Sequence, residues 1–237
     1  MRLLLTRPQA DADRTAAALR ARGHDVVIAP VLRIEPIADA DVSAGPWAAI
    51  LVTSANAASA IAANRRVAEL RALPVFAVGE HSAQAMRDAG FPQVVSAGGG
   101  VADLVRLVVQ NMKPGAQLLY LAGADRSGDL AGELGARDFA VHTVVVYRAL
   151  AADTLPPAAA AALAGGIDGI LHFSRRSAEA YVHAVRAVGL GEAALRKPAH
   201  FCLSAQVAEP LVRTGASDVR IATEPTEAAL IALLSAA

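Results

Sequence analysis

A short apolar strand pattern that runs directly into a polar turn and then into a helix occurs twice in the chain. The apolar residues 49–52 lead into the turn 53–56, and the segment 168–182 repeats this order with Ser174 at the place of Ser54. A helix that begins directly after a strand leaves its first backbone N–H groups without partners. Hydroxyl side chains or a bound anion can satisfy them, so helix capping and anion binding are both open for these turns.

The two copies belong to a longer internal repeat. The opening strand-helix-strand pattern of residues 3–33 matches residues 118–148 at a constant interval, and residues 75–95 match residues 200–219 in the same way. The order along the chain is therefore X-Y-X′-Y′, where X and Y are two different α/β units. We interpret this pattern as an internal duplication, with the alanine-rich composition as the competing explanation.

Strands that alternate with helices predict an α/β fold with parallel sheets covered on both faces. In such sheets the functional loops follow the carboxyl ends of the strands. None of these loops forms a GxGxxG pattern with a following acid, a phosphate-binding GxxxxGK[ST] loop or a GxSxG turn. The loops are instead small, polar or basic, and they contain Thr6-Arg7-Pro8, Thr53-Ser54-Ala55-Asn56, Gly79, Ser174-Arg175-Arg176-Ser177 and Ser204.

Composition excludes several classes of protein. The 22 basic and 22 acidic residues cancel, so no nucleic-acid footprint is expected. No apolar run approaches the roughly 18 residues that span a bilayer, and the opening residues 1–8 are too short an apolar run for a signal peptide. The single cysteine, Cys202, fits a cytoplasmic protein, and the scattered histidines give no metal-ligand spacing. Arginine far outnumbers lysine, which suits carboxylate recognition but also follows from a GC-rich genome.

Short stretches spread along the whole chain resemble the uroporphyrinogen-III synthases. Three departures accompany the resemblance: Ala122 stands where many members have Arg, Phe173 replaces the Thr of the second turn, and Ser204 stands where the first half has Gly79. The stretches that carry the resemblance are Leu5-Thr6-Arg7-Pro8, residues 52–57, Ala77-Val78-Gly79, Val146-Tyr147-Arg148, residues 170–177 and Pro225-Thr226.

The resemblance implies two flavodoxin/Rossmann-like α/β domains with parallel sheets, joined by a two-stranded antiparallel linker. Residues 1–33 and 150–237 are expected to form a discontinuous outer domain, and residues 38–144 an inserted domain. The connecting strands are expected at 34–37 and 145–149. The protein is expected to be a monomer.

The resemblance also implies an activity. The family cyclises the linear polycarboxylate hydroxymethylbilane to uroporphyrinogen III, with loss of water and inversion of ring D through a spiro intermediate. This reaction leads to heme, siroheme, chlorophyll and cobalamin, and it needs no cofactor and no metal. The expected partners are this substrate and, for a transient hand-over, the preceding enzyme of the pathway; neither nucleic acid nor a membrane is expected. The alternative is a non-catalytic two-domain protein that binds small anions.

Tyr147 is the expected catalytic residue by the same resemblance, because its hydroxyl could assist departure of the leaving hydroxyl group; the alternative is a tyrosine that packs the connector. His81 and His172 are weaker candidates for proton transfer, since a lone histidine is more often structural, and Arg176 is a weaker candidate for carboxylate binding. The expected substrate-binding residues are Thr6, Arg7, Pro8, Thr53, Ser54, Asn56, Gly79, Arg148, Ser174, Arg175, Ser177, Ser204 and Thr226.

Overall fold

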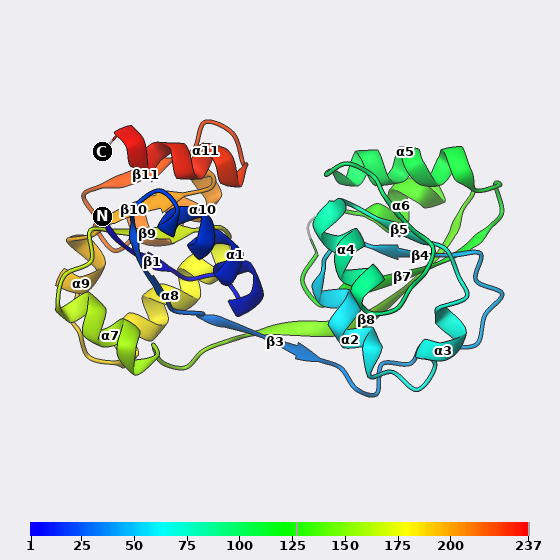
Figure 1. Ribbon diagram of the computed structural model, residues 1–237, viewed down its shortest axis with the longest axis horizontal. Helices are drawn as coiled ribbons and strands as arrows, with labels where there is room; N and C mark the ends of the chain where they lie inside the picture. Colours follow the sequence, from blue (N-terminus) through cyan, green and yellow to red (C-terminus); the bar gives the residue numbers. More distant parts are fainter. Residues whose placement is uncertain (127, 237) are drawn as a thin grey trace. The chain divides into compact units, whose positions relative to one another are not determined.

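The chain forms two α/β units in a computed structural model that describes residues 1–126 and 128–236 (Figure 1). Unit 1 contains Met1–Arg33 and Leu150–Ala237, and unit 2 contains Ile34–Ala149. Each unit has its own sheet and its own buried clusters on the two faces of that sheet.

Unit 1 is built on a parallel sheet of five strands in the order β11-β10-β9-β1-β2. Each strand is a run of three or four residues that is largely apolar, as expected for the buried strands of a parallel sheet, and the edge strands β2 and β11 are only partly buried. The strands are β1 (Arg2–Leu5), β2 (Asp25–Ile28), β9 (Gly169–His172), β10 (Ala199–Cys202) and β11 (Val219–Ile221).

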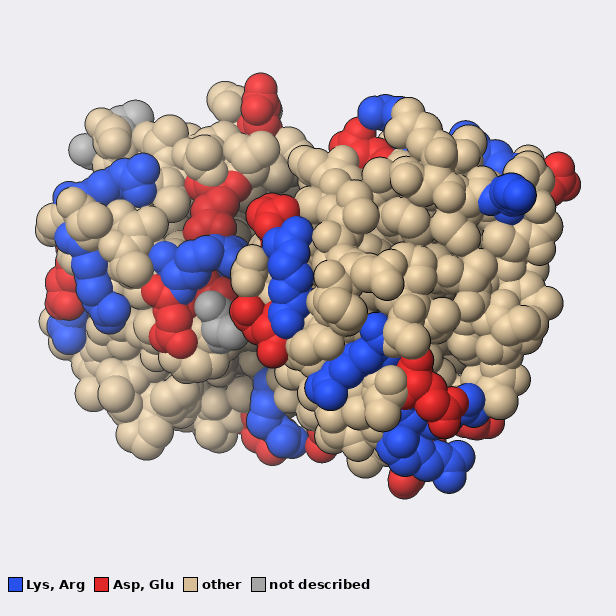
Figure 2. Space-filling model, turned by 45° about the vertical axis from the view of Figure 1, so that its right-hand side comes forward, with Lys and Arg blue, Asp and Glu red and all other residues tan. Residues whose placement is uncertain are grey.

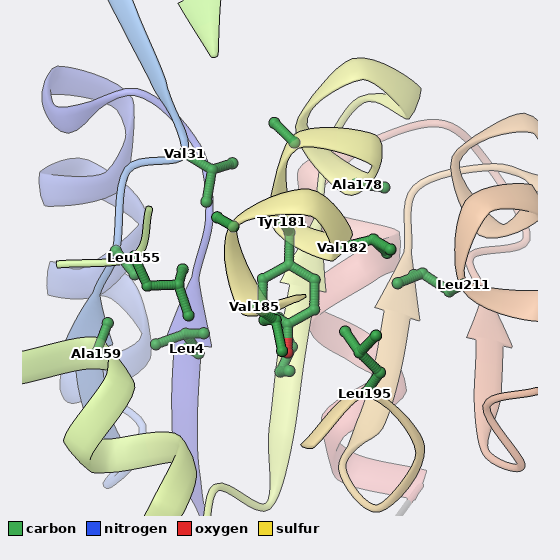
Figure 3. Packing of buried hydrophobic residues seen from close by; sticks show 14 of the residues in the cluster. Leu4, Val31, Leu155, Ala159, Ala178, Tyr181, Val182, Val185, Leu195 and Leu211 are labelled. Carbon is green, nitrogen blue, oxygen red and sulfur yellow. The ribbon is translucent and has the colours of Figure 1, made fainter. Parts of the chain in front are cut away.

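The side chains of β1 alternate between two buried clusters, because successive strand residues point to opposite faces. Leu4 joins the cluster that contains Tyr181 and Leu195, which lie close together in Figure 3. Leu3 and Leu5 join the other cluster. The first face is covered by α7 (Pro157–Ala164), α8 (Arg175–Ala187), α9 (Ala193–Arg196) and α10 (Ala205–Val212), and the second by α1 (Gln9–Arg20), α11 (Glu227–Ala232) and the 3-10 turn η1 (Leu233–Ala236).

Unit 2 is built on a sheet of six strands in the order β3-β8-β7-β4-β5-β6, in which the strands from β8 to β6 are parallel. The central strand β4 is fully buried, which its uninterrupted apolar sequence predicts. The strands are β3 (Leu32–Pro36), β4 (Ala49–Val52), β5 (Val75–Ala77), β6 (Val94–Ser96), β7 (Gln117–Gly123) and β8 (Ala140–Ala151).

The faces of the second sheet follow the same alternation. Ile50 and Val52 contact one buried cluster, and Ala49 and Leu51 contact the other. The first face is covered by α2 (Asn56–Ala62), α3 (Val67–Leu70) and α4 (Glu80–Asp88), and the second by α5 (Val101–Asn111) and α6 (Leu130–Gly135). The predicted α/β class with two mostly parallel sheets is therefore confirmed.

Strands β3 and β8 run antiparallel to each other. The backbone N–H of Ile37 donates to the carbonyl of Val146 (2.8 Å), and that of Ala152 donates to the carbonyl of Val31 (2.9 Å). Residue numbers therefore increase along one strand where those of its partners decrease. The connecting strand expected at 145–149 is part of a longer continuous strand, β8.

The two sheets share strand order and register. Read from one edge, the parallel strands of unit 1 follow the order β2-β1-β9-β10-β11, and those of unit 2 follow the order β8-β7-β4-β5-β6. In both units the two strands of X come first, the later one at the edge, and the three strands of Y follow in chain order. This agreement supports the duplication inferred from the sequence, which we retain as a proposal. The pair Leu3–Val26 of unit 1 corresponds to Leu118–Val141 of unit 2. The pair Leu4–Ile170 corresponds to Leu119–Ile50, and the pair Ile170–His200 corresponds to Ile50–Val75.

Candidate functional site

A polar pocket lies in unit 2 where the parallel strands β4, β5 and β7 end. Its volume is about 360 Å³. The carboxyl ends of parallel strands meet at one edge of a sheet, so residues far apart in the sequence converge there. The lining residues are Thr53, Ser54, Val78, Gly99, Val101, Asp125, Arg126 and Tyr147. Three of these, Thr53, Ser54 and Tyr147, are sequence-predicted site residues.

Hydroxyl groups dominate one wall of this pocket. The Thr53 hydroxyl lies 2.7 Å from the hydroxyl of Tyr120, whose ring is buried in the sheet. The Ser54 Oγ accepts a hydrogen bond from the Asn56 backbone N–H (3.2 Å) and also hydrogen-bonds the Tyr147 phenol. The turn is thus a local hydroxyl turn that in addition contacts a tyrosine on another strand.

Tyr147 is partly buried, and its surroundings keep its phenol protonated. Burial raises the pKa of Tyr147 above its usual value, the hydrogen bond with Ser54 lowers it, and the neighbouring Tyr120 adds a smaller upward shift. The net direction is upward. A phenol with a raised pKa is a proton or hydrogen-bond donor near neutral pH.

Gly79 immediately precedes α4, and its neighbour Val78 lines the pocket. The backbone of Gly79 is extended (φ −160°), and the carbonyl of the preceding Val78 accepts a hydrogen bond from the Gly99 N–H (2.8 Å). This bond ties the loop after β5 to the glycine loop that precedes α5. The pocket therefore lies next to the amino terminus of the nine-residue helix α4, the end of a helix that favours negative charge.

Arg126 and Asp125 are pocket residues that the sequence analysis did not single out. Both are exposed, and they follow the end of β7 after one intervening residue, Ala124. In the ranges 1–126 and 128–236, no carboxylate lies within ion-pair distance of Arg126. Their position after the carboxyl end of a predicted strand was the signal that could have identified them.

The predicted site residues of unit 1 are engaged within that unit. The Arg7 guanidinium donates to Thr15 (2.9 Å) and Glu227 (3.0 Å) and lies 4.1 Å from the centre of the Phe173 ring. The Thr6 hydroxyl is fully buried and donates to the carbonyl of Leu171 (3.1 Å).

Two of the predicted hydroxyls cap helices. The Ser174 Oγ accepts from the backbone N–H of Ser177 (3.1 Å) at the start of α8, and Thr226 accepts from Ala229 (3.2 Å) at the start of α11. Ser204 occupies the same position before α10 but makes no side-chain capping bond. The capping interpretation therefore describes Ser174 and Thr226, and substrate binding by these residues stays a prediction.

Two predicted arginines pair with acids of their own unit. Arg148 contacts Glu35 (2.6 Å), and Arg175 contacts Glu179 (3.0 Å) and Glu209 (3.3 Å). On the face that Figure 2 shows, basic and acidic side chains mostly lie side by side, as the balanced charge predicts. These pairs are exposed, so a ligand carboxylate could replace the protein acid at modest cost.

His172 is not at the pocket. It is fully buried in unit 1, and burial together with the neighbouring His200 lowers its pKa well below the usual value. A side chain with no exposed surface cannot exchange protons with a substrate in a pocket. Over the described ranges, no group of three or more His, Cys, Asp or Glu side chains could hold a metal ion, and no helix is long and apolar enough to cross a membrane.

The fold and the pocket define a class of protein. Parallel α/β units with a polar pocket at the carboxyl ends of the strands are typical of enzymes and small-molecule binding proteins. Solved structures with the same fold include uroporphyrinogen-III synthetase from Helicobacter pylori 26695 (TM-score 0.67, 16% identity, 100% of this chain and 99% of that chain). A mutant uroporphyrinogen III synthase from the extremely thermophilic bacterium Thermus thermophilus is also similar (TM-score 0.51, 16% identity, 99% and 96% of the two chains).

A family model narrows this class. The model for uroporphyrinogen-III synthase HemD matches residues 13–232, which is most of the chain. A sequence search of curated proteins gives no significant match. The chain belongs to the uroporphyrinogen-III synthase family, whose members are lyases that cyclise hydroxymethylbilane in tetrapyrrole biosynthesis.

Proposed function

We propose that this protein converts hydroxymethylbilane to uroporphyrinogen III with inversion of ring D through a spiro intermediate, and that the unit 2 pocket carries the chemistry. The observation that supports this assignment is that the Tyr147 phenol lines the same polar pocket as Ser54 and Arg126. The pyrroles of the substrate supply the nucleophile and the electron push, so the protein has to bind, orient and protonate.

Tyr147 starts the reaction in this mechanism. Its phenol donates a proton to the hydroxyl on the terminal hydroxymethyl carbon while the C–O bond breaks and the pyrrole nitrogen releases its electron pair into the ring. Water leaves, and the electrophilic azafulvene remains as a cation that keeps its N–H proton. The phenolate regains a proton when the closed macrocycle loses the hydrogen that its new carbon–carbon bond displaces. The hydrogen bond with Ser54 assists because it lowers the pKa of Tyr147 and so makes the phenol a better acid.

Arg126 binds a substrate carboxylate beside Tyr147. A guanidinium can hold a carboxylate through two parallel hydrogen bonds, and such charged bonds are about twice as strong as neutral ones. The amino terminus of α4 next to Gly79 offers backbone N–H groups for a second carboxylate. Holding a flexible substrate in one reactive shape can contribute on the order of 7–11 kcal/mol to lowering a barrier.

The predicted domains are proposals of the same kind. We assign residues 1–33 with 150–237 and residues 38–144 to two domains, with connecting strands at 34–37 and 145–149; the contact clusters of the fold support this division. The monomeric state and a transient hand-over from the preceding enzyme are further proposals. A cytoplasmic location is supported by the lone thiol of Cys202, which is buried and unpaired by any disulfide.

The products distinguish this function from the alternative of a non-catalytic anion-binding protein. Purified protein is incubated with hydroxymethylbilane, and the type I and type III isomers are separated by chromatography. We expect type III product at a rate proportional to the protein concentration. Type I product alone, formed at the spontaneous rate, would instead favour the binding protein.

A further inference from the structure

Strand β8 carries an irregularity beside the pocket. Its register against β7 is regular from Ala140 to Val145, which lies opposite Ala122, but the next pair is Gly123 with Tyr147. Val146 is therefore an extra residue that has no partner on β7. Such a bulge changes the direction in which the following side chain points.

The burial of the side chains shows the effect of this bulge. In a regular strand, Val146 and Tyr147 would point to opposite faces of the sheet. Val144 and Val146 both belong to the cluster on the face covered by α2 and α4, and Tyr147 packs against this same cluster. Tyr147 therefore lies on the face of its neighbour Val146, the face from which it contacts Ser54.

Gly123 lies directly against the redirected ring. A Cβ atom at Gly123 would lie 2.7 Å from Cζ of Tyr147 and 2.8 Å from both Cε2 and the hydroxyl oxygen. Gly123 is not among the glycines with a positive φ, so its backbone would accept alanine. The requirement for glycine at position 123 therefore comes from the Tyr147 ring, which occupies the place of a Cβ atom, and not from the backbone conformation. Just after this point, the Ala124 N–H donates to the carbonyl of Tyr147 (2.9 Å).

We propose that Gly123 is a positioning residue: together with the bulge at Val146, its bare backbone fixes the place of the Tyr147 hydroxyl in the pocket. This inference rests on the proposed catalytic role of Tyr147. A methyl group at position 123 would push the ring away from its place beside Ser54. Displacing a reacting group by about 1 Å lowers the reaction rate on the order of 100-fold, whereas substrate binding changes much less.

A double-mutant cycle tests the inference. The kcat and KM for type III formation are measured for the natural protein, Gly123→Ala, Tyr147→Phe and the double variant. We expect Gly123→Ala alone to lower kcat roughly 10- to 100-fold with little change in KM. In the Tyr147→Phe background, where no hydroxyl remains to misplace, the same change should alter kcat less than about twofold. The matched control is Gly135→Ala, because a Cβ there meets no atom within 4 Å.

The outcomes distinguish the positioning role of Gly123 from the catalytic role of Tyr147. Equal losses from Gly123→Ala in both backgrounds, or no loss in either, would overturn the positioning role. Full activity of Tyr147→Phe would remove the catalytic role of Tyr147 and the positioning role with it, while type III formation by the natural protein would still stand. If Gly123→Ala does not fold, Gly123→Ala with Tyr147→Ala is compared with Tyr147→Ala alone. Equal thermal stability of these two supports the contact, and failure to recover folding overturns it.

Discussion

The Nε2 atom of His172 lies 3.1 Å from the Nδ1 atom of His200 in the interior of unit 1. The other nitrogen of His200 lies 2.7 Å from the carbonyl oxygen of Leu195, and the ring of Tyr181 packs edge-on against His172. The bond to a carbonyl requires that His200 carry its proton on Nε2, so His172 donates to the Nδ1 of His200. Two neutral imidazoles fit these two contacts, whereas Nδ1 of His172 is buried without a hydrogen-bond partner among the described residues.

The stability of the protein should therefore depend on pH. Burial lowers the pKa of both histidines; the charge of its partner lowers that of His172 further, whereas the bond to Leu195 and the nearby Asp218 partly offset the shift of His200. Above about pH 6.5 the unfolded histidines are neutral too, and the pair has no effect. As the pH falls below this value, the unfolded chain takes up protons that the folded pair does not. The free energy of unfolding then falls by up to about 1.4 kcal/mol per pH unit for each histidine, until the folded pKa is reached.

Urea unfolding between pH 8 and pH 5 measures this dependence. The variant His172→Asn removes one of the two titrating groups at similar volume and should reduce the slope. A slope between pH 6.5 and pH 5 that is the same in the variant and in the natural protein would show that the pair does not take part.

Ser54→Ala should slow turnover more than it changes binding. The hydrogen bond with Ser54 lowers the pKa of Tyr147, so its loss raises that pKa and weakens the phenol as an acid. We expect kcat to fall about 3- to 10-fold, the effect of one hydrogen bond of roughly 1 kcal/mol. The control is Ser59→Ala, since the Ser59 hydroxyl donates to the Asn56 carbonyl on the exposed side of α2 (3.1 Å). Similar kcat values for Ser54→Ala and Ser59→Ala would contradict the mechanism.

Arg126→Gln should weaken substrate binding. Loss of one charged hydrogen-bonded contact of about 1.5–3 kcal/mol predicts a KM increase of roughly 10- to 100-fold. The control is Arg106→Gln, whose guanidinium pairs with Asp103 on the exposed surface of α5 (3.1 Å). Steady-state kinetics at two salt concentrations provide the measurement, because the contribution of Arg126 should shrink as salt screens it. An unchanged KM would mean that the substrate carboxylates bind elsewhere.

The order of strands and helices could be predicted from the sequence because buried parallel strands are short apolar runs. The run 49–52 is β4 to the residue, and Ala12, Ala16 and Leu19 are buried on α1 as their spacing predicts. The four-residue helices α3 and α9 were not predicted, since one turn of helix has no periodicity to detect.

The pocket could be predicted only in part. Thr53 and Ser54 follow a recognisable strand, but the contact between Ser54 and Tyr147 joins residues on different strands. The bulge at Val146 depends on the register of β8 against β7. The sequence of one strand does not determine its register against the neighbouring strand. Arg126 lies in a loop without a motif, so only its place after β7 connects it to the site.

The rate of type III formation by Tyr147→Phe tests the central claim most directly. The variant keeps the ring that packs against Gly123 and loses only the hydroxyl, so circular dichroism and thermal unfolding should match those of the natural protein. Under single-turnover conditions we expect the rate of uroporphyrinogen III formation to fall by about 100-fold or more, the usual contribution of a positioned proton donor. An unchanged rate, with the type III isomer still the product, would contradict the claim and leave Tyr147 as a packing residue.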